Sequence, residues 1–508
     1  MRFPIPDRFQ FKHVAVFASV IFVAQVLEGT ELLFAVFTCA YTLIWATAFN
    51  VSGGIRYPSG AFIFFNGFLN AILGLSMKVL LGQPGDRNLV SPDTTMACYC
   101  VGAIGMLAAA FVCRGLRPTH GLLPGFNSLA AMKQAAIVCL VAGTLVTLLT
   151  TVSGSLSANP IITALRQINK MPIMAIFLGT TYEVLHSKGK RSVNWIVFTS
   201  IAVVFSFGLI SFGKQGMLIG FAAWFIAAFS QRYDFPRLQL AGGVLAFGFF
   251  SYYLVPYSQY VRTFRAPTFA ENGAIALHYL MDLGETRRIY NEAISDFNLS
   301  DEPHLYDQRE GFLDRLVVLP MDDALINYTD KGNVFGLTPT VMSYSSIVPR
   351  FIWHNKPSGS SGNMYAHELG LLADEDLTTG IAFSAAADGY HQAKWLGLLL
   401  VLPLDMFLFF LISDSVVGSA KWAPWALIPI LDFSELGPEG GLGSPVYYMT
   451  YGMVGIVAIF VITRYVAPII LKTVRQPNFA ALNTPLQPST GTINSAGVVP
   501  PLKEGSSF

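Results

Sequence analysis

Long apolar runs separated by short polar junctions recur along most of the chain. The hydrocarbon core of a bilayer requires about 20 mostly apolar residues per helix. Twelve runs meet this requirement and are predicted to span a membrane, near residues 12–27, 32–50, 60–81, 94–113, 134–153, 171–186, 193–213, 216–231, 238–256, 395–413, 416–432 and 446–464. Backbone polar groups in lipid must be satisfied within the segment, so every span is predicted to be a helix. The pattern therefore predicts an all-α integral membrane protein with about 12 transmembrane helices and one large, partly helical loop.

That loop, residues 257–394, holds nearly half of the charged residues, a composition typical of a folded unit rather than a linker. Apolar residues recur at near-helical spacing in 271–297, which is predicted to be one amphipathic helix of the kind that lies on a membrane surface. The run 311–336 is predicted to form a second helix and a Gly-punctuated turn, and 343–372 an ordered loop.

Lysine and arginine gather at alternate junctions. If the amino terminus is cytoplasmic, the even-numbered junctions and the tail carry Arg56, Arg114, Arg117, Lys133, Lys188, Lys190, Arg191, Arg232, Arg237, Lys421, Arg464, Lys472 and Arg475. Short loops on the other side, such as 28–31 and 434–441, are poor in both residues. The positive-inside rule therefore predicts that 257–394 lies outside the cytoplasm.

Four parts follow from this organisation. Residues 1–256 are predicted to form an N-terminal transmembrane bundle of about nine helices, 257–394 the large extracytoplasmic loop, and 395–475 the C-terminal transmembrane helices. The end, 476–508, is rich in Pro, Ser, Thr and Gly and is predicted to be a disordered cytoplasmic tail, because it has too little apolar surface to bury.

Composition agrees with the membrane assignment. Hydrophobic residues make up 53% and charged residues 12% of the chain, whereas soluble domains are about one quarter charged. The formal net charge of +1 gives no basic surplus of the kind that binds nucleic acid. The five cysteines lie in or beside apolar runs, and none has a His or further Cys at metal-ligand spacing. We therefore expect no disulfide framework, no metal and no cofactor.

A proline-flanked run in the large loop carries a family resemblance. The run 347–357, IVPRFIWHNKP, resembles the signature of bacterial Wzy-type polymerases of lipid-linked oligosaccharide repeat units, the O-antigen and exopolysaccharide polymerases. Supporting context is found at Gly213-Lys214-Gln215-Gly216, Asp314-Arg315-Leu316, Gly336, Asn363, Tyr365, Gly370 and 378–397, which includes Asp388-Gly389-Tyr390. The chain has His354 and Asn355 where an Asp is frequent in the family.

The resemblance implies a glycosyltransferase of the bacterial inner membrane. Such an enzyme takes a glycan from undecaprenyl diphosphate and joins it to another lipid-linked repeat unit, with the large loop in the periplasm. It implies as partners the lipid-linked glycans, membrane lipids, and the chain-length regulator and flippase of the same pathway. The chain has no Gly-rich phosphate loop after a strand, which suits an enzyme that uses no nucleotide.

A departing diphosphate needs cations to stabilise its charge, and Arg suits bidentate phosphate contact. Arg350 is the first candidate, because the resemblance places the family motif there and Pro349 and Pro357 stiffen the segment. Lys214, in a very short junction, is the second candidate. Further candidates are Arg315 and Lys356, with Arg262 and Arg265 binding lipid headgroups or glycan. The alternatives are a snorkelling lysine, structural ion pairs and interfacial anchors.

The acceptor hydroxyl needs a general base within hydrogen-bond reach. His391 and Asp388 are preferred over His367 and His354, because they precede the tenth span. The alternative for each histidine is a satisfied structural role. Side chains expected to bind sugar are Trp353, Tyr365 and Tyr390.

Six further ionisable residues require an interpretation. The neighbouring carboxylates Asp322 and Asp323 point about 100° apart on a helix, which argues against a shared site. Lys78, Glu183, Asp405 and Asp432 lie in or beside predicted spans, and Asp405 is expected to face the bundle interior.

Three other functions compete with the polymerase. An O-antigen ligase would pass the same glycan to a lipid A core. A transporter predicts ionisable residues and Pro or Gly breaks near the midplane in both halves, whereas here the polar residues concentrate in one loop. A structural or sensor protein would need no cation cluster at the membrane surface.

Overall fold

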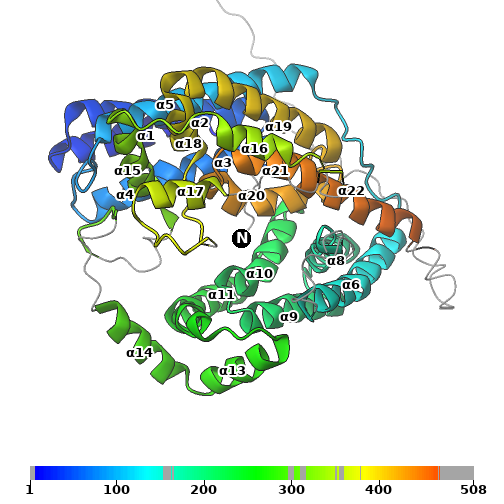
Figure 1. Ribbon diagram of the computed structural model, residues 1–508. Coiled ribbons are helices and arrows are strands. Elements are labelled where there is room, and N and C mark those ends of the chain that lie inside the picture. Colours follow the sequence, from blue (N-terminus) through cyan, green and yellow to red (C-terminus); the bar gives the residue numbers. More distant parts are fainter. Residues whose placement is uncertain are drawn as a thin grey trace, which may run out of the picture.

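The computed structural model describes residues 6–152, 162, 165–295, 303–308, 316–348, 352–353, 360–377, 379–466 and 468. Within these residues the chain is helical and contains no β-strand (Figure 1). An isolated β-bridge joins Phe383 and Gly440. The prediction of an all-α fold is confirmed for this part of the chain.

Seven helices of the described residues are long and apolar enough to cross a membrane. They are α2 (Leu32–Ser52), α3 to α4 (Pro58–Leu80), α5 (Pro92–Leu116), α6 (Leu129–Val152), α11 to η4 (Arg237–Phe264), α18 to α19 (Ala385–Val417) and α21 to η10 (Gly443–Val466). Three shorter apolar helices are α1 (Phe11–Leu27), α9 (Trp195–Ile210) and α10 (Lys214–Ser230). The chain is therefore an α-helical membrane protein, and the total of about 12 spans stays a prediction.

Two further helices lie at predicted spans but are buried inside the bundle. Nearly every residue of α8 (Met171–His186) is buried. The other, α20 (Leu427–Glu439), begins later than the predicted run 416–432. The chain leaves α19 at Gly418, whose φ of +67° ends the helix, and Pro424 opens a short 3-10 turn before α20. The predicted bounds of this span were therefore wrong, because hydropathy does not register the turn.

The helices form two packed groups (Figure 1). In one, α2 packs on α1, α3 and α5, and α19 and α20 close over α3 and α5. In the other, α8 packs against α6, α9 and α10. The groups meet where α10 and α8 contact α20. This seam holds the candidate site described below.

The junctions between predicted spans contact one another in two sets. In the first set, the Glu31 amide donates to Asp86 at 2.9 Å, the Ser91 amide donates to Asp323 at 3.0 Å, and Arg87 pairs with Asp307 at 3.1 Å. All of these residues belong to junctions or loops predicted to be extracytoplasmic.

The second set joins junctions predicted to be cytoplasmic. Arg117 pairs with Asp414 at 2.7 Å, and Arg56 pairs with Asp7. The Ala420 amide, which lies just inside the predicted run 416–432, donates to the Arg56 carbonyl at 2.9 Å. This grouping is the one that the predicted alternation of spans requires.

The large loop contains α13 (Phe269–Met281), α14 (Leu283–Ser295), α15 (Leu319–Asp330), α16 (Thr338–Ser345) and α17 (Ser361–Glu368). The single helix predicted for 271–297 is two helices, because Asp282 has non-helical dihedrals and its carboxylate accepts the Glu285 amide at 3.0 Å, which starts α14. Thr268 and Glu271 form a capping box that starts α13.

The two ends of the large loop differ. The boundary predicted at 256 falls inside the continuous helix Arg237–Phe264. The boundary at 394 coincides with a kink, since Ala393 and Lys394 have non-helical dihedrals between α18 (Ala385–Leu396) and α19 (Leu402–Val417). Gly397 is required there, because a Cβ would lie 1.8 Å from the Gly389 carbonyl oxygen. The kink therefore packs α18 directly against the start of the membrane helix.

Candidate functional site

The residues predicted to supply a base lie in a buried polar network. Asp388, in the first turn of α18, accepts the Tyr365 hydroxyl at 2.6 Å and the Gln392 amide at 2.7 Å on one oxygen. Its other oxygen accepts the Leu442 backbone amide at 2.8 Å. With 1% of its surface exposed, Asp388 is fully occupied in joining α17, α18 and the turn after α20.

His391 is fully buried in the same network. Its Nδ1 lies 2.8 Å from the Thr329 hydroxyl and its Nε2 lies 3.0 Å from the Glu368 carboxylate. The Tyr365 ring stands perpendicular to the imidazole with centroids 4.6 Å apart. Both ring nitrogens are engaged, which favours the structural interpretation, and the role of His391 as a base stays a prediction.

His367, another predicted base, and the tyrosines predicted to bind sugar are also engaged within the protein, whereas His354 lies outside the described residues. The ring nitrogens of His367 lie 2.8 and 3.0 Å from the carbonyls of Asn363 and Ala373. Tyr365 is fully buried, and Tyr390 is buried with its hydroxyl donating to Asp330 at 2.6 Å. Neither tyrosine presents a free face to a glycan.

Asp322 and Asp323 point to different partners, as predicted. Asp322 accepts the Tyr99 hydroxyl at 2.6 Å and the Ser384 amide at 2.9 Å. Asp323 accepts the Thr95 hydroxyl at 2.9 Å besides the Ser91 amide. The two carboxylates tie α15 to α5 and to the start of α18, and they form no shared site.

Burial raises the pKa of Asp322 from 3.8 to about 7, opposed by its hydrogen bonds. Because the folded state then holds a proton that the unfolded state has lost, Asp322 makes folding less favourable as the pH rises from about 4 to about 7. Asp322→Asn is expected to remove this pH dependence, which amounts to up to about 4 kcal/mol in the free energy of unfolding. Thermal unfolding of the purified protein measures it, and a variant-minus-wild-type difference that stays constant across this range would contradict it.

The second set of polar residues lies at the seam between the helix groups. Lys214 is the first residue of α10, after Gly213. Its charge acts on the Glu439 carboxylate, and its neighbour Gln215 donates to Glu435. Among the described residues, Lys214 is the predicted catalytic residue that lies at this seam.

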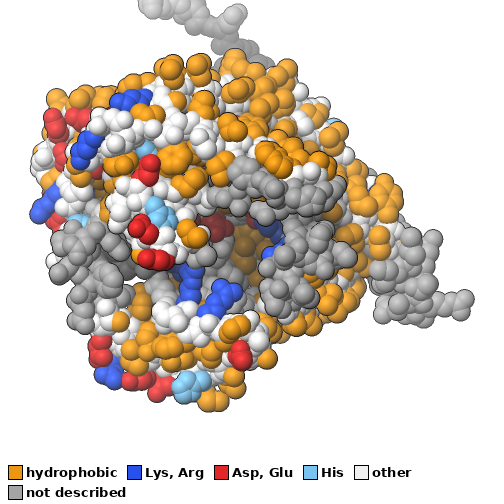
Figure 2. All heavy atoms as spheres, in the orientation of Figure 1, with side chains coloured by type: hydrophobic (Ala, Val, Ile, Leu, Met, Phe, Trp, Pro, Cys, Tyr) orange, Lys and Arg blue, Asp and Glu red, His pale blue; other side chains and the backbone are white. Residues whose placement is uncertain are grey.

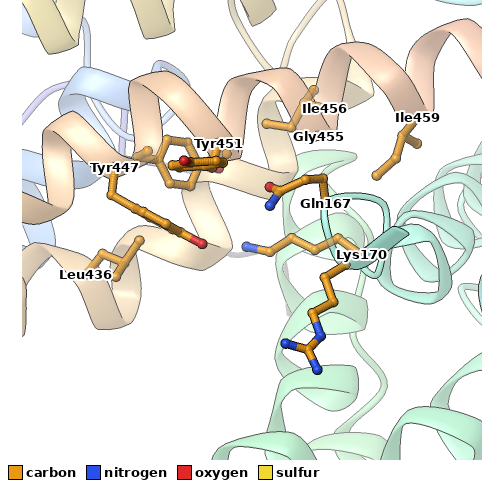
Figure 3. A pocket seen from close by; sticks show the side chains of 11 residues that line it. Gln167, Lys170, Leu436, Tyr447, Tyr451, Gly455, Ile456 and Ile459 are labelled. Atoms are coloured by element: carbon orange, nitrogen blue, oxygen red, sulfur yellow. The ribbon is translucent and has the colours of Figure 1, made fainter. Parts of the chain in front are cut away.

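Two cations that the sequence did not single out, Arg166 and Lys170, also lie at this seam. They precede α8 and, with Gln167, line a cavity of about 320 Å³ (Figure 3). The opposite wall comes from Leu436 and from the last helix, by Tyr447, Tyr448, Tyr451, Gly452, Gly455, Ile456 and Ile459. The cavity thus has a cationic side and an aromatic and aliphatic side.

Three carboxylates of α20 face these cations. Asp432, Glu435 and Glu439 recur at spacings of three and four, which places them on one side of the helix. Asp432 is buried, forms an ion pair with Lys170, and accepts the Tyr448 hydroxyl at 2.7 Å. Figure 2 shows a hollow in the middle of this face with acidic and basic side chains on its walls.

The side chains of Glu435 and Glu439 are reached by water although protein surrounds them on several sides. This partial burial raises the pKa of Glu435, and the Gln215 hydrogen bond opposes it. Burial, followed by the negative charge of Glu435, raises the pKa of Glu439 to about 7, against the opposing charge of Lys214. A carboxyl with this pKa exchanges a proton near neutral pH.

The segment that leads to the motif residue Arg350 is anchored beside the cavity. Tyr344 of α16 donates to Asp405 of α19, and Tyr451 donates to the Ser346 carbonyl at 2.9 Å. Arg350, Arg315 and Lys356 lie outside the described residues. Trp353 is described and 43% exposed.

Arg262 and Arg265 are both exposed. Arg262 opens the short 3-10 turn that ends the helix Arg237–Phe264, and Arg265 follows that turn. Neither lines the cavity.

The ionisable residues of the spans are accounted for individually. Lys78 is buried and donates to the Gly85 carbonyl at 3.1 Å and to the Arg87 carbonyl. Asp405 is 2% exposed, which confirms that it faces the bundle interior. Glu183 is half-buried next to Asn194. Within the described residues, no group of three or more His, Cys, Asp or Glu side chains is arranged to hold a metal ion.

Sequence signals for the missed residues existed. Arg166 and Lys170 are basic residues in a junction predicted to be extracytoplasmic, where the positive-inside rule makes them exceptions. The spacing of Asp432, Glu435 and Glu439 marks a charged helix side within an apolar region. Comparison with known protein families, curated proteins and solved structures finds no match for the chain.

Proposed function

We propose that the chain is a membrane glycosyltransferase that polymerises undecaprenyl-diphosphate-linked repeat units into a surface polysaccharide at the outer face of the bacterial inner membrane. In this proposal it is a Wzy-type polymerase with about 12 spans, and the loop 257–394 lies in the periplasm. The polymerase transfers the growing glycan from its lipid carrier to the terminal sugar of the next repeat unit.

The observation that carries the proposal is the gathering of cations along α20: Arg166 and Lys170 line the cavity, Lys170 pairs with Asp432, and the charge of Lys214 acts on Glu439. They come from the starts of two helices that are distant in sequence, α8 and α10. A diphosphate that leaves with a negative charge is stabilised by such preorganised cations. A structural or sensor protein has no need of them.

The opposite wall of the cavity suits the rest of the substrate. Tyr447 is 53% exposed, and its ring lies 5.0 Å from that of Tyr451. Aromatic faces of this kind pack against the apolar faces of sugars. Gly455, Ile456 and Ile459 continue the wall into the last membrane helix, where a polyprenyl chain meets apolar side chains. The cavity is therefore polar at one part and apolar at another, as an amphiphilic lipid donor requires.

The orientation is supported by the two sets of junction contacts. Arg166, Lys170, Lys214, Glu435 and Glu439 all belong to junctions that the charge asymmetry places outside the cytoplasm. Their meeting at one site agrees with that assignment, and the diphosphate of a carrier used in the periplasm lies at the same membrane surface.

The proposal is tested in a bacterium that makes a surface polysaccharide with this protein. Deletion of the gene is expected to leave single repeat units on the lipid carrier, because elongation stops after the first unit. Arg350→Ala is expected to reproduce this pattern at an unchanged protein level. The measurement is the length distribution of lipid-linked and surface glycan on gels.

Other outcomes assign other functions. Long, lipid-linked polymer that is not attached to lipid A would favour a ligase. Repeat units trapped at the cytoplasmic face would favour a transporter. Normal long chains after deletion would contradict a role in this pathway.

A further inference from the structure

One carboxylate at the seam lacks the partners that the other two have. Asp432 is buried and paired with Lys170, and Glu435 accepts the Gln215 amide. Glu439 is exposed, and within the described residues it forms no hydrogen bond or ion pair. Its oxygens are therefore available to a hydroxyl that enters the site.

The position of Glu439 is fixed by the turn that follows it. The Gly441 amide donates to the Phe383 carbonyl at 2.9 Å, and the Leu442 amide donates to Asp388. Gly441 has a φ of +53°, and a Cβ there would lie 2.5 Å from the Asp388 carboxylate, so only glycine fits. Asp388 thus acts on the site as a positioning residue, because it holds the turn at the end of α20.

Glu439 also lies near the cations. Lys214, at the start of α10, is the positive charge that acts on it, and Leu436, one turn earlier on α20, lines the cavity with Lys170 and Arg166. A hydroxyl bound at Glu439 is therefore close to the part of the site proposed to hold the diphosphate.

We propose that Glu439 is the general base of the reaction and accepts the proton of the acceptor sugar hydroxyl. The inference rests on the proposed function and names a residue that the family resemblance does not indicate. The acceptor oxygen forms a bond to the anomeric carbon as the bond from that carbon to the phosphate oxygen breaks. The diphosphate leaves with the electron pair, and the hydroxyl proton passes to Glu439 and then to water.

This role predicts a pH profile. The base must be ionised, so the rate is expected to fall about tenfold for each pH unit below the pKa of Glu439, about 7. Lys214 of α10 and Glu435 of its own helix are the charges that act on it. Asp388 of α18 lies across the turn at Gly441, and Asp432, which pairs with Lys170, lies earlier on α20. Lys214→Gln removes a positive charge that lowers the pKa of Glu439, so the fall in rate is expected to begin at a higher pH in this variant.

The test uses the full-length protein in lipid nanodiscs, with the lipid-linked repeat unit of the producing strain as both donor and acceptor. Glu439→Gln is expected to lower the elongation rate about 100-fold or more and to abolish the fall below neutral pH, while binding of the lipid-linked unit is retained. Glu439→Asp keeps a base and is expected to keep the pH profile at a reduced rate. Glu375→Gln, an exposed carboxylate of the large loop, is the matched control.

The outcomes separate the inference from the function. Elongation by Glu439→Gln within about twofold of the wild type, or an unchanged pH profile, would overturn the role of Glu439 and leave the polymerase standing. Failure of the wild-type protein to elongate the lipid-linked unit would overturn both. A Glu439→Gln variant that elongates slowly but still binds the lipid-linked unit, together with a fully active Glu375→Gln control, supports Glu439 as the general base.

Discussion

Arg166→Ala is expected to reduce polymer formation by about 100- to 1,000-fold without lowering the amount of protein in the membrane. Arg166 lines the cavity, its side chain is exposed, and within the described residues it forms no ion pair that holds the fold together. Its removal therefore takes away a cation that is proposed to bind the leaving diphosphate, at little structural cost. The measurement is the rate of chain elongation together with the protein level on immunoblots.

Substitution of Arg166 tests a role in catalysis separately from a role in folding, which substitution of Lys170 does not. Lys170→Ala would also leave the buried Asp432 carboxylate without its cation, which destabilises the protein in its own right. Arg114→Ala, an exposed arginine at the opposite set of junctions, is the matched control and is expected to be silent. Equal chain lengths in Arg166→Ala and in this control would remove Arg166 from the site.

Asp414→Ala is expected to lower the free energy of unfolding by about 3–5 kcal/mol. Asp414 is fully buried at the end of α19, pairs with Arg117 at 2.7 Å and accepts both the amide and the hydroxyl of Ser59. Loss of the carboxylate leaves the Arg117 guanidinium, which also lies 3.6 Å from the Tyr57 ring centroid, with an uncompensated charge in a poorly solvated place. Thermal or denaturant unfolding in detergent measures the effect.

The exposed pair of Glu285 and Arg288 on α14 supplies the comparison. Both side chains are exposed, so water and ions screen their attraction, and Glu285→Ala is expected to be nearly neutral. If Asp414→Ala and Glu285→Ala had the same melting temperature, Asp414 would contribute no more to stability than a surface ion pair does.

The apolar runs predicted most helices because lipid leaves the backbone few choices. The runs 32–50 and 94–113 correspond to α2 and α5, each extended by a few residues. The predictions failed where a polar or glycine residue ends a helix inside a continuous pattern. Gly418 does so before α20, and Asp282 does so between α13 and α14.

The candidate site was less predictable, because burial and pairing depend on contacts between distant segments. His391 and Asp388 have side chains that can act as a base. Their ring nitrogens and oxygens are occupied by Thr329, Glu368 and Tyr365, which belong to other helices and are distant from them in the sequence. Lys214 was identified because it lies in a very short junction. The other charged residues at the seam are distant from it in the sequence. Charges on three segments become one site only when the helices pack.

The bonds of Asp388 have a consequence for engineering. One carboxylate joins a helix of the large loop, the helix that enters the membrane, and the turn between two helices of the C-terminal half. The loop is therefore not a transferable module. Grafting residues 257–394 onto another polytopic scaffold would keep Tyr365 and Gln392 beside this carboxylate but would remove the Leu442 amide that it accepts, so chimaeras should keep the loop with its native C-terminal helices.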